Sequence, residues 1–149
     1  MFFAPGDAEA YLDLLRMYAR RAGLAIFAYC LMPNHVHTVA IPSREDSLER
    51  ALQPVHSQYA QRVNRMRGIV GHLWQGRFRS CALDADHFLN AVRYVERNPV
   101  AARMVERAEN YPWSSAAAHC GLRTDPLLEP ASASSVFKAI ANWSDWLAI

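Results

Sequence analysis

The sequence has few cysteines and no long apolar run, and each shortage excludes a class of protein. Cys30, Cys81 and Cys120 are an odd number, widely spaced and without a CxxC pair, so neither a disulfide framework nor a zinc knuckle is predicted. The longest apolar stretch, residues 24–31, is strand-sized and far shorter than the roughly 20 residues of a membrane span. The first residues lack the basic start and apolar middle of a secretory signal. We therefore expect a cytoplasmic protein with no membrane partner.

Lysine is also scarce, since fifteen of the sixteen basic residues are arginine. The net charge of +2 is uneven: residues 61–107 hold nine arginines against four acids, a balance of +5. Arginine grips phosphate with a planar fork and stacks on bases, so this cluster favours a nucleic-acid surface. A GC-rich genome would favour arginine codons as well, which explains the residue type but not the clustering.

The bulk composition is that of one ordinary domain. The 149 residues are 52% hydrophobic and 20% charged, which suits a folded chain with one core. We expect a single domain over residues 1–149, in which about 124–149 form a C-terminal tail.

Helical and strand patterns alternate along the chain. Apolar spacing predicts helices over residues 7–22, 47–66 and 85–97, the last ended by Pro99. Pro54 predicts a kink or a late start of the second helix. Apolar runs bounded by turn residues predict strands over residues 24–31, 36–41 and 77–83. This order predicts an α+β fold with one antiparallel sheet, followed by loops and short helices.

Two histidines, His35 and His37, stand two residues apart in a predicted strand. Residues at this spacing leave the same face of a sheet, so the two imidazoles make half of a divalent-metal site. A His-x-His pair in a strand can also be a plain surface pair, or one core histidine and one exposed histidine. The predicted helix at 85–97 supplies context, because Tyr94 and Asn98 lie one turn apart on one face, with His87 two turns earlier. Taken singly, Tyr94 can be a packed tyrosine and Asn98 a helix terminator.

An aromatic and basic run follows the second predicted helix. Residues 74–79 read WQGRFR. The run combines aromatic rings that can stack on bases with arginines that can bind phosphate, as binding sites for unpaired bases do. The alternative is a buried tryptophan and phenylalanine flanked by solvated arginines. The candidate DNA-binding residues of the chain are Arg62, Arg65, Trp74, Arg77, Arg79, Arg93 and Arg97.

Four segments together resemble a known family. They are CLMPNHVH (30–37), GHLWQGRF (71–78), RYVERNPVAA (93–102) and YPWSS (111–115). In this order they resemble the REP-associated tyrosine transposases, a branch of the single-tyrosine, His-hydrophobic-His transposases. The resemblance covers roughly residues 10–120.

This resemblance implies roles residue by residue. His35 and His37 match the pair that binds Mg²⁺ or Mn²⁺ against the scissile phosphate. Asn98 matches the polar residue that completes the metal site, and Tyr94 matches the nucleophile. The implied fold is a ferredoxin-like or RRM-like antiparallel sheet with helices on one face. The implied substrate is single-stranded DNA beside imperfect palindromic hairpins, cut by a monomer or homodimer associated with the nucleoid.

The expected chemistry agrees with these residue types. A tyrosine has an ordinary pKa near 10, so it needs help to attack phosphorus at neutral pH. A divalent cation polarises the phosphate and lowers the barrier to an anionic nucleophile. A 5′-phosphotyrosine would preserve the bond energy for a second 3′-hydroxyl, giving strand transfer rather than plain hydrolysis. Tyr59 and Tyr111 are rival nucleophiles, but neither has a ligand-type residue one turn on.

The chain departs from the family at its start, where the usual first strand is not predicted. The missing strand has three possible explanations: a mis-assigned start codon, a decayed gene copy, or a strand donated by a partner chain. The alternative function is a non-catalytic protein that binds hairpin or repeat DNA with the same surface. A metal-dependent hydrolase of a small substrate is a third possibility, against which the arginine cluster counts.

Overall fold

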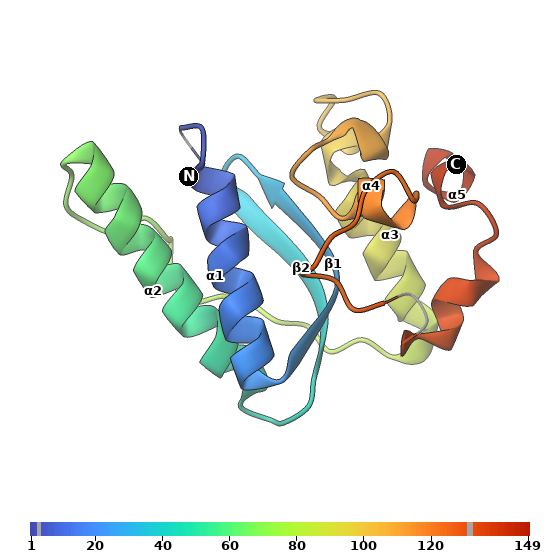
Figure 1. The fold of residues 1–149 in the computed structure, drawn as a ribbon, viewed down its shortest axis with the longest axis horizontal. Coiled ribbons are helices and arrows are strands. Elements are labelled where there is room, and N and C mark those ends of the chain that lie inside the picture. Colours follow the sequence, from blue (N-terminus) through green and yellow to red (C-terminus); the bar gives the residue numbers. More distant parts are fainter. Residues whose placement is uncertain (3, 131–132) are drawn as a thin grey trace. The chain divides into compact units, whose positions relative to one another are not determined.

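The chain alternates helices with one antiparallel hairpin of strands (Figure 1). This computed structural model describes residues 1–2, 4–130 and 133–149. The long elements are α1 (Asp7–Ala22), β1 (Leu24–Met32), β2 (His35–Pro42), α2 (Ser47–Arg67) and α3 (Ala85–Ala101). Shorter helices follow: η1 (Ala108–Asn110), α4 (Ala116–His119), η3 (Ser135–Ala139) and α5 (Trp143–Ala148). The predicted α+β class is confirmed, and no helix among the described residues is long and apolar enough to cross a membrane.

One compact unit contains Met1–Ala25 and Ile41–Cys81. Its helices α1 and α2 lie side by side (Figure 1). The rings of Tyr11 and Tyr59, both buried, meet edge to face with centroids 5.4 Å apart, a favourable aromatic geometry. Gly23 ends α1 in the left-handed conformation, φ 67°, which glycine adopts without a Cβ penalty. The helix α2 runs from Ser47 through Pro54, as predicted, so of the two alternatives that Pro54 suggested the late start is wrong.

The second compact unit contains Ile26–Ala40 and Ala82–Ile149. Most of the hairpin belongs to it, together with α3 and the short helices. The edge of β1 that faces away from β2 is covered by later chain: Leu31 N donates to Trp113 O at 2.8 Å, and Glu129 N donates to Ile26 O at 2.8 Å. In the described part of the chain the sheet has two strands, and the isolated bridges fall on β1 alone. Among these residues no strand or bridge pairs with the outer edge of β2.

A two-stranded sheet is consistent with a ferredoxin-like sheet that lacks its first strand. The described residues before α1 contain no strand, as expected. The predicted third strand, residues 77–83, is wrong: these residues have no regular structure and are mostly exposed. A strand must pair its backbone N–H and C=O groups with a neighbour, and in the described sheet no strand lies beside this segment.

The end of α3 also differs from the prediction. The helix runs to Ala101, one turn beyond the predicted end at Arg97. Pro99 lies in that last turn, where the missing N–H costs a single hydrogen bond. Its ring is fully buried, which offsets that cost. The single domain over 1–149 with a tail from about 124 stays a prediction, although the late residues Phe137, Trp143 and Leu147 are buried.

Candidate active site

The two histidines of β2 lie together, as their spacing predicted. The ring centroids of His35 and His37 are 4.6 Å apart, with the planes at 90°. His35 is exposed and His37 is half-buried. Burial lowers the pKa of His37, and the nearby His35 lowers it further, because a second positive charge there would be repelled. The neutral imidazole that results is the form that binds metals.

Tyr94 of α3 lies against this pair. Its ring centroid is 5.7 Å from that of His37, at an interplanar angle of 82°. The side chain of Tyr94 is well exposed, with 64% of the residue surface open to solvent. Asp84 fixes the start of this helix, because its Oδ1 accepts from the backbone N–H of His87 at 2.9 Å in a standard N-cap. The helix thus presents a reachable phenol beside the histidines.

Asn98 follows Tyr94 by one helical turn. Its Nδ2 donates to the Tyr94 carbonyl oxygen at 3.4 Å, and its Oδ1 is the atom that a metal would use. His87, two turns before Tyr94, has its Nδ1 2.6 Å from Asp84 Oδ1 at the other end of the same helix. The Asp84 carboxyl group that caps the helix therefore also contacts the side chain of His87.

The donor set suits a divalent metal only if Asn98 takes part. Among the described residues, no three His, Cys, Asp or Glu side chains are placed to hold a metal ion. Two imidazoles on one strand face, joined by an amide oxygen, would leave coordination positions for water or phosphate oxygens. Imidazole suits transition-metal ions better than Mg²⁺, which prefers oxygen. With water and phosphate oxygens in the remaining positions, this mixed nitrogen and oxygen donor set would be compatible with Mg²⁺ or Mn²⁺.

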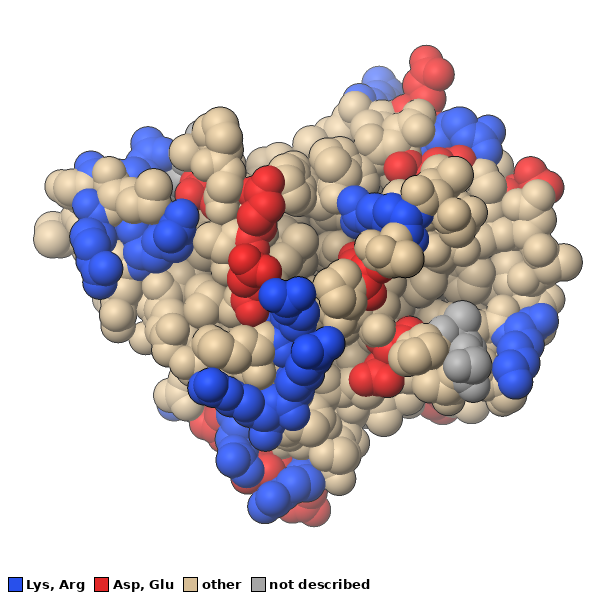
Figure 2. Space-filling view, in the orientation of Figure 1, with Lys and Arg blue, Asp and Glu red and all other residues tan. Residues whose placement is uncertain are grey.

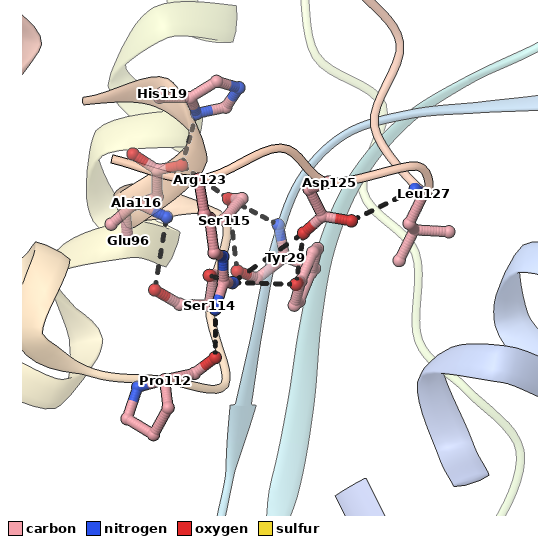
Figure 3. Close-up of polar contacts among 10 residues, drawn as sticks. All are labelled: Tyr29, Glu96, Pro112, Ser114, Ser115, Ala116, His119, Arg123, Asp125 and Leu127. Carbon is pink, nitrogen blue, oxygen red and sulfur yellow. Dashed lines mark hydrogen bonds and ion pairs between the residues drawn. The ribbon is translucent and has the colours of Figure 1, made fainter. Parts of the chain in front are cut away.

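A buried glutamate on the same helix was missed in the sequence. Glu96 is fully buried, and its carboxyl group accepts three hydrogen bonds from later segments. Oε1 accepts from Ser115 Oγ at 2.5 Å and from His119 Nδ1 at 2.5 Å, and Figure 3 shows both partners turned toward it. Oε2 accepts from Trp143 Nε1 at 2.8 Å. Helical periodicity alone could have found Glu96, because it falls on the core face beside Val92 and Val95.

A second polar cluster attaches the same later segments to β1. Tyr29 Oη donates to Asp125 Oδ2 at 2.6 Å, and Arg123 Nη2 donates to Ser114 O at 2.5 Å. Figure 3 shows these groups beside Ser115, whose N–H donates to Tyr29 O at 3.0 Å. The strand that precedes the histidines is therefore tied to the segment that binds Glu96.

Five of the candidate DNA-binding residues lie in the other compact unit. Arg62 and Arg65 line a groove of about 800 Å³ between α1 and α2. The Trp74 indole stacks on the His56 ring with centroids 4.2 Å apart, and its N–H donates to His56 O at 2.8 Å. Trp74 is half-buried, and its indole N–H is fixed by the hydrogen bond to His56. Arg77 lines a smaller groove of about 500 Å³ with Trp74, and Arg79 is exposed.

Arg93 and Arg97 flank the tyrosine on α3 in the second unit. Both donate to the Ile149 oxygen, Arg93 at 2.5 Å, and the Arg93 guanidinium lies 5.5 Å from the Trp146 ring centre. In this structure both guanidinium groups therefore contact α5 or the residue that follows it. Figure 2 shows basic side chains in several groups on the face drawn, with acidic side chains close beside some of them.

Comparison with known proteins gives one family. The family model described as "Transposase IS200 like" matches residues 1–98, about two thirds of the chain, and this segment includes the histidine pair, Tyr94 and Asn98. No curated protein and no solved structure gives a match.

Proposed function

The chain belongs to the IS200-like transposase family, and from this premise we propose that it is a metal-dependent single-tyrosine enzyme. It would cut and rejoin single-stranded DNA beside imperfect palindromic hairpins, as the resemblance to REP-associated transposases implies. As a transposase it acts on DNA. The single observation that supports the single-tyrosine chemistry is the exposed Tyr94 ring 5.7 Å from the ring of His37.

Exposure separates Tyr94 from its rivals. Tyr59 Oη donates to Met1 O at 3.0 Å, and Tyr111 Oη donates to Leu31 O at 2.8 Å. Burial raises the pKa of both phenols, which makes their oxygens harder to ionise and poorer nucleophiles. Tyr94 is also the tyrosine that shares a face of α3 with a metal-ligand type of residue, Asn98.

In the proposed reaction, Tyr94 Oη forms a bond to the phosphorus of the scissile phosphodiester. The bond from phosphorus to the 3′-oxygen breaks, that oxygen takes up a proton, and the phenol proton is lost to solvent or a neighbouring base. A 5′-phosphotyrosine and a free 3′-hydroxyl result. Attack on phosphorus by another 3′-hydroxyl reverses the exchange and releases the phenol, so the number of phosphodiester bonds is conserved.

His35, His37 and the Asn98 amide would hold the metal. When bound, the cation would neutralise the phosphate oxygens and polarise the P–O bond. All three ligands are uncharged, so none of the positive charge at the site would be cancelled by the protein. Arg62 and Arg65 would bind phosphates of the DNA strand through the groove that they line, and Trp74 would stack on an unpaired base.

End-labelled single-stranded hairpin oligonucleotides test this function. With Mn²⁺ we expect a protein-linked 5′ product on a denaturing gel, absent with EDTA and abolished in Tyr94→Phe. Tyr18→Phe is the matched control, because Tyr18 is another partly exposed tyrosine on a helix surface. A covalent product that persists in Tyr94→Phe would overturn the assignment of the nucleophile.

The alternative is a non-catalytic protein that binds hairpin DNA. One observation favours it: the described sheet has two strands, and no segment that the structure describes pairs with the outer edge of β2. An edge without a neighbour gives the ligand-bearing strand less support. Hairpin binding with no covalent product in Mn²⁺, unchanged in Tyr94→Phe, is the outcome expected for this alternative.

A further inference from the structure

Asn34 is the last residue of the turn that joins β1 to β2, and its side chain contacts the first histidine. We infer that Asn34 is a positioning residue that fixes the tautomer of His35, so that His35 Nε2 is the atom that faces a metal. The inference rests on the proposed function, because it concerns the same histidine pair.

The contact between the two side chains defines which nitrogen carries the proton. Asn34 Oδ1 lies 2.6 Å from His35 Nδ1. An amide oxygen accepts hydrogen bonds and cannot donate them. His35 Nδ1 must therefore carry the hydrogen, and in the neutral ring Nε2 then holds a free lone pair.

This arrangement reverses the preference of an isolated histidine. Free neutral imidazole side chains favour the tautomer with the hydrogen on Nε2, where it blocks the lone pair that would bind a metal. Histidine ligands in proteins almost always donate their second ring N–H to an oxygen acceptor, which sets the ring orientation and raises the basicity of the other nitrogen. Asn34 supplies such an acceptor from the adjoining residue.

The two histidines are held by different means. His37 is half-buried, and its ring packs against Tyr94. His35 is exposed, so packing restricts it less and a hydrogen bond has more effect. Because Asn34 belongs to the hairpin turn itself, the residue that leads into β2 also orients the first ligand.

Long-range ¹H–¹⁵N NMR of the imidazole rings tests the tautomer directly, without metal or DNA. At a pH where His35 is neutral, we expect the pattern of an Nδ1–H ring in the wild-type protein, assigned by comparison with His35→Gln. In Asn34→Ala we expect a shift toward the Nε2–H form. Asn110→Ala is the matched control, since Asn110 is an exposed asparagine in η1 of the same unit. An Nε2–H ring in the wild-type protein would overturn the inference, because the amide would then be donating.

Mn²⁺ binding, followed by electron paramagnetic resonance of the free ion, tests the consequence. Loss of an outer hydrogen bond to a ligand typically weakens metal affinity about 10–100-fold, and we expect a loss of this size in Asn34→Ala. Asn34→Asp keeps an oxygen acceptor and the turn, and should bind Mn²⁺ at least as well as the wild-type protein. Equal affinity in wild-type and Asn34→Ala would overturn the inference.

The two readouts keep this inference apart from the proposed function. A wild-type protein with the Nδ1–H ring that binds no Mn²⁺ would overturn the metal site in the proposed function, and with it the purpose assigned to Asn34. A wild-type protein that binds Mn²⁺ through an Nε2–H ring would overturn the role of Asn34 and leave the proposed function standing.

Discussion

Tyr94 differs from most other tyrosines of the chain in what surrounds its hydroxyl. Tyr11, Tyr29, Tyr59 and Tyr111 are buried, and burial raises the pKa of each. Each buried phenol also has a hydrogen-bond partner, so each has a structural task. The spacing of Tyr94 and Asn98 could be predicted from the sequence. The contrast in exposure could not, because it depends on which faces the folded chain covers.

His56 gives a residue-scale prediction about pH. Burial lowers its pKa from the ordinary 6.5, and its Nε2 lies 3.1 Å from Tyr11 Oη. The unfolded chain therefore binds a proton at His56 more readily than the native protein does. Stability from this residue is present above pH 6.5 and is lost as the pH falls through the lowered native pKa.

Urea denaturation between pH 7.5 and 5 measures this effect. The free energy of unfolding should fall toward pH 5 in the wild-type protein, and less steeply in His56→Gln. His72→Gln is the control, since His72 is exposed and should leave the slope unchanged. Identical slopes in wild-type and His56→Gln would contradict the prediction.

At the scale of elements, local patterns were sufficient where an element makes its own hydrogen bonds or pairs with its neighbour in sequence. The helices α1 and α2 and the hairpin of β1 with β2 were predicted within a few residues, because their apolar spacing and turn residues are local. Residues 77–83 have a strand-like alternation but no neighbouring strand in the described sheet. Pairing with a distant segment is a property of the whole fold, and the sequence pattern does not contain it.

The hydrogen bonds that join α3 to later segments of the chain likewise could not be predicted from the sequence pattern. Spacing was enough to predict that His35 and His37 lie together, and the resemblance pairs them with Tyr94, whose ring contacts that of His37. The three donors to Glu96 come from Ser115, His119 and Trp143, up to 47 residues away, and their convergence requires the folded backbone. They join α3 to Ser115, to α4 and to α5.

Removing one donor to Glu96 gives an element-scale prediction. Trp143→Phe keeps an aromatic ring but removes the indole N–H bonded to Glu96 Oε2. A buried acceptor left without its partner costs about 1–3 kcal/mol, so the free energy of unfolding should fall by this amount in urea denaturation. Trp113→Phe is the control, because Trp113 is half-buried and contributes its backbone carbonyl, not its indole, to a described hydrogen bond. Equal losses in the two variants would show that the hydrogen bond to Glu96 is not the cause.

On the scale of the whole molecule, the region that matches the family does not contain all the residues that stabilise α3. The match ends at residue 98, within α3. Every described donor to the Glu96 side chain lies beyond that point. The segment that carries the histidines and Tyr94 therefore relies on residues outside the matched region to cover its buried carboxyl group.

A chain that ends at residue 110 tests this dependence. It retains α3 but lacks all three donors, leaving a carboxyl group with no partner on a face that would otherwise be buried. We expect circular dichroism to show loss of cooperative thermal unfolding. Glu96→Leu in the same short chain should recover part of the helix signal, since an apolar side chain needs no donors. Unchanged cooperative unfolding of the short chain would show that residues 111–149 are dispensable for α3.

The three donors to Glu96 also limit how this gene can recombine with its relatives. A crossover between the codons of Glu96 and Trp143 would join the acid from one parent to the serine, histidine or tryptophan positions of another. A hybrid with a residue that cannot donate at one of these positions would inherit an unsatisfied acceptor on the helix that carries Tyr94. We therefore expect exchange within this stretch of 48 codons to cost the least stability between parents that share all four residues, which favours its inheritance as a block.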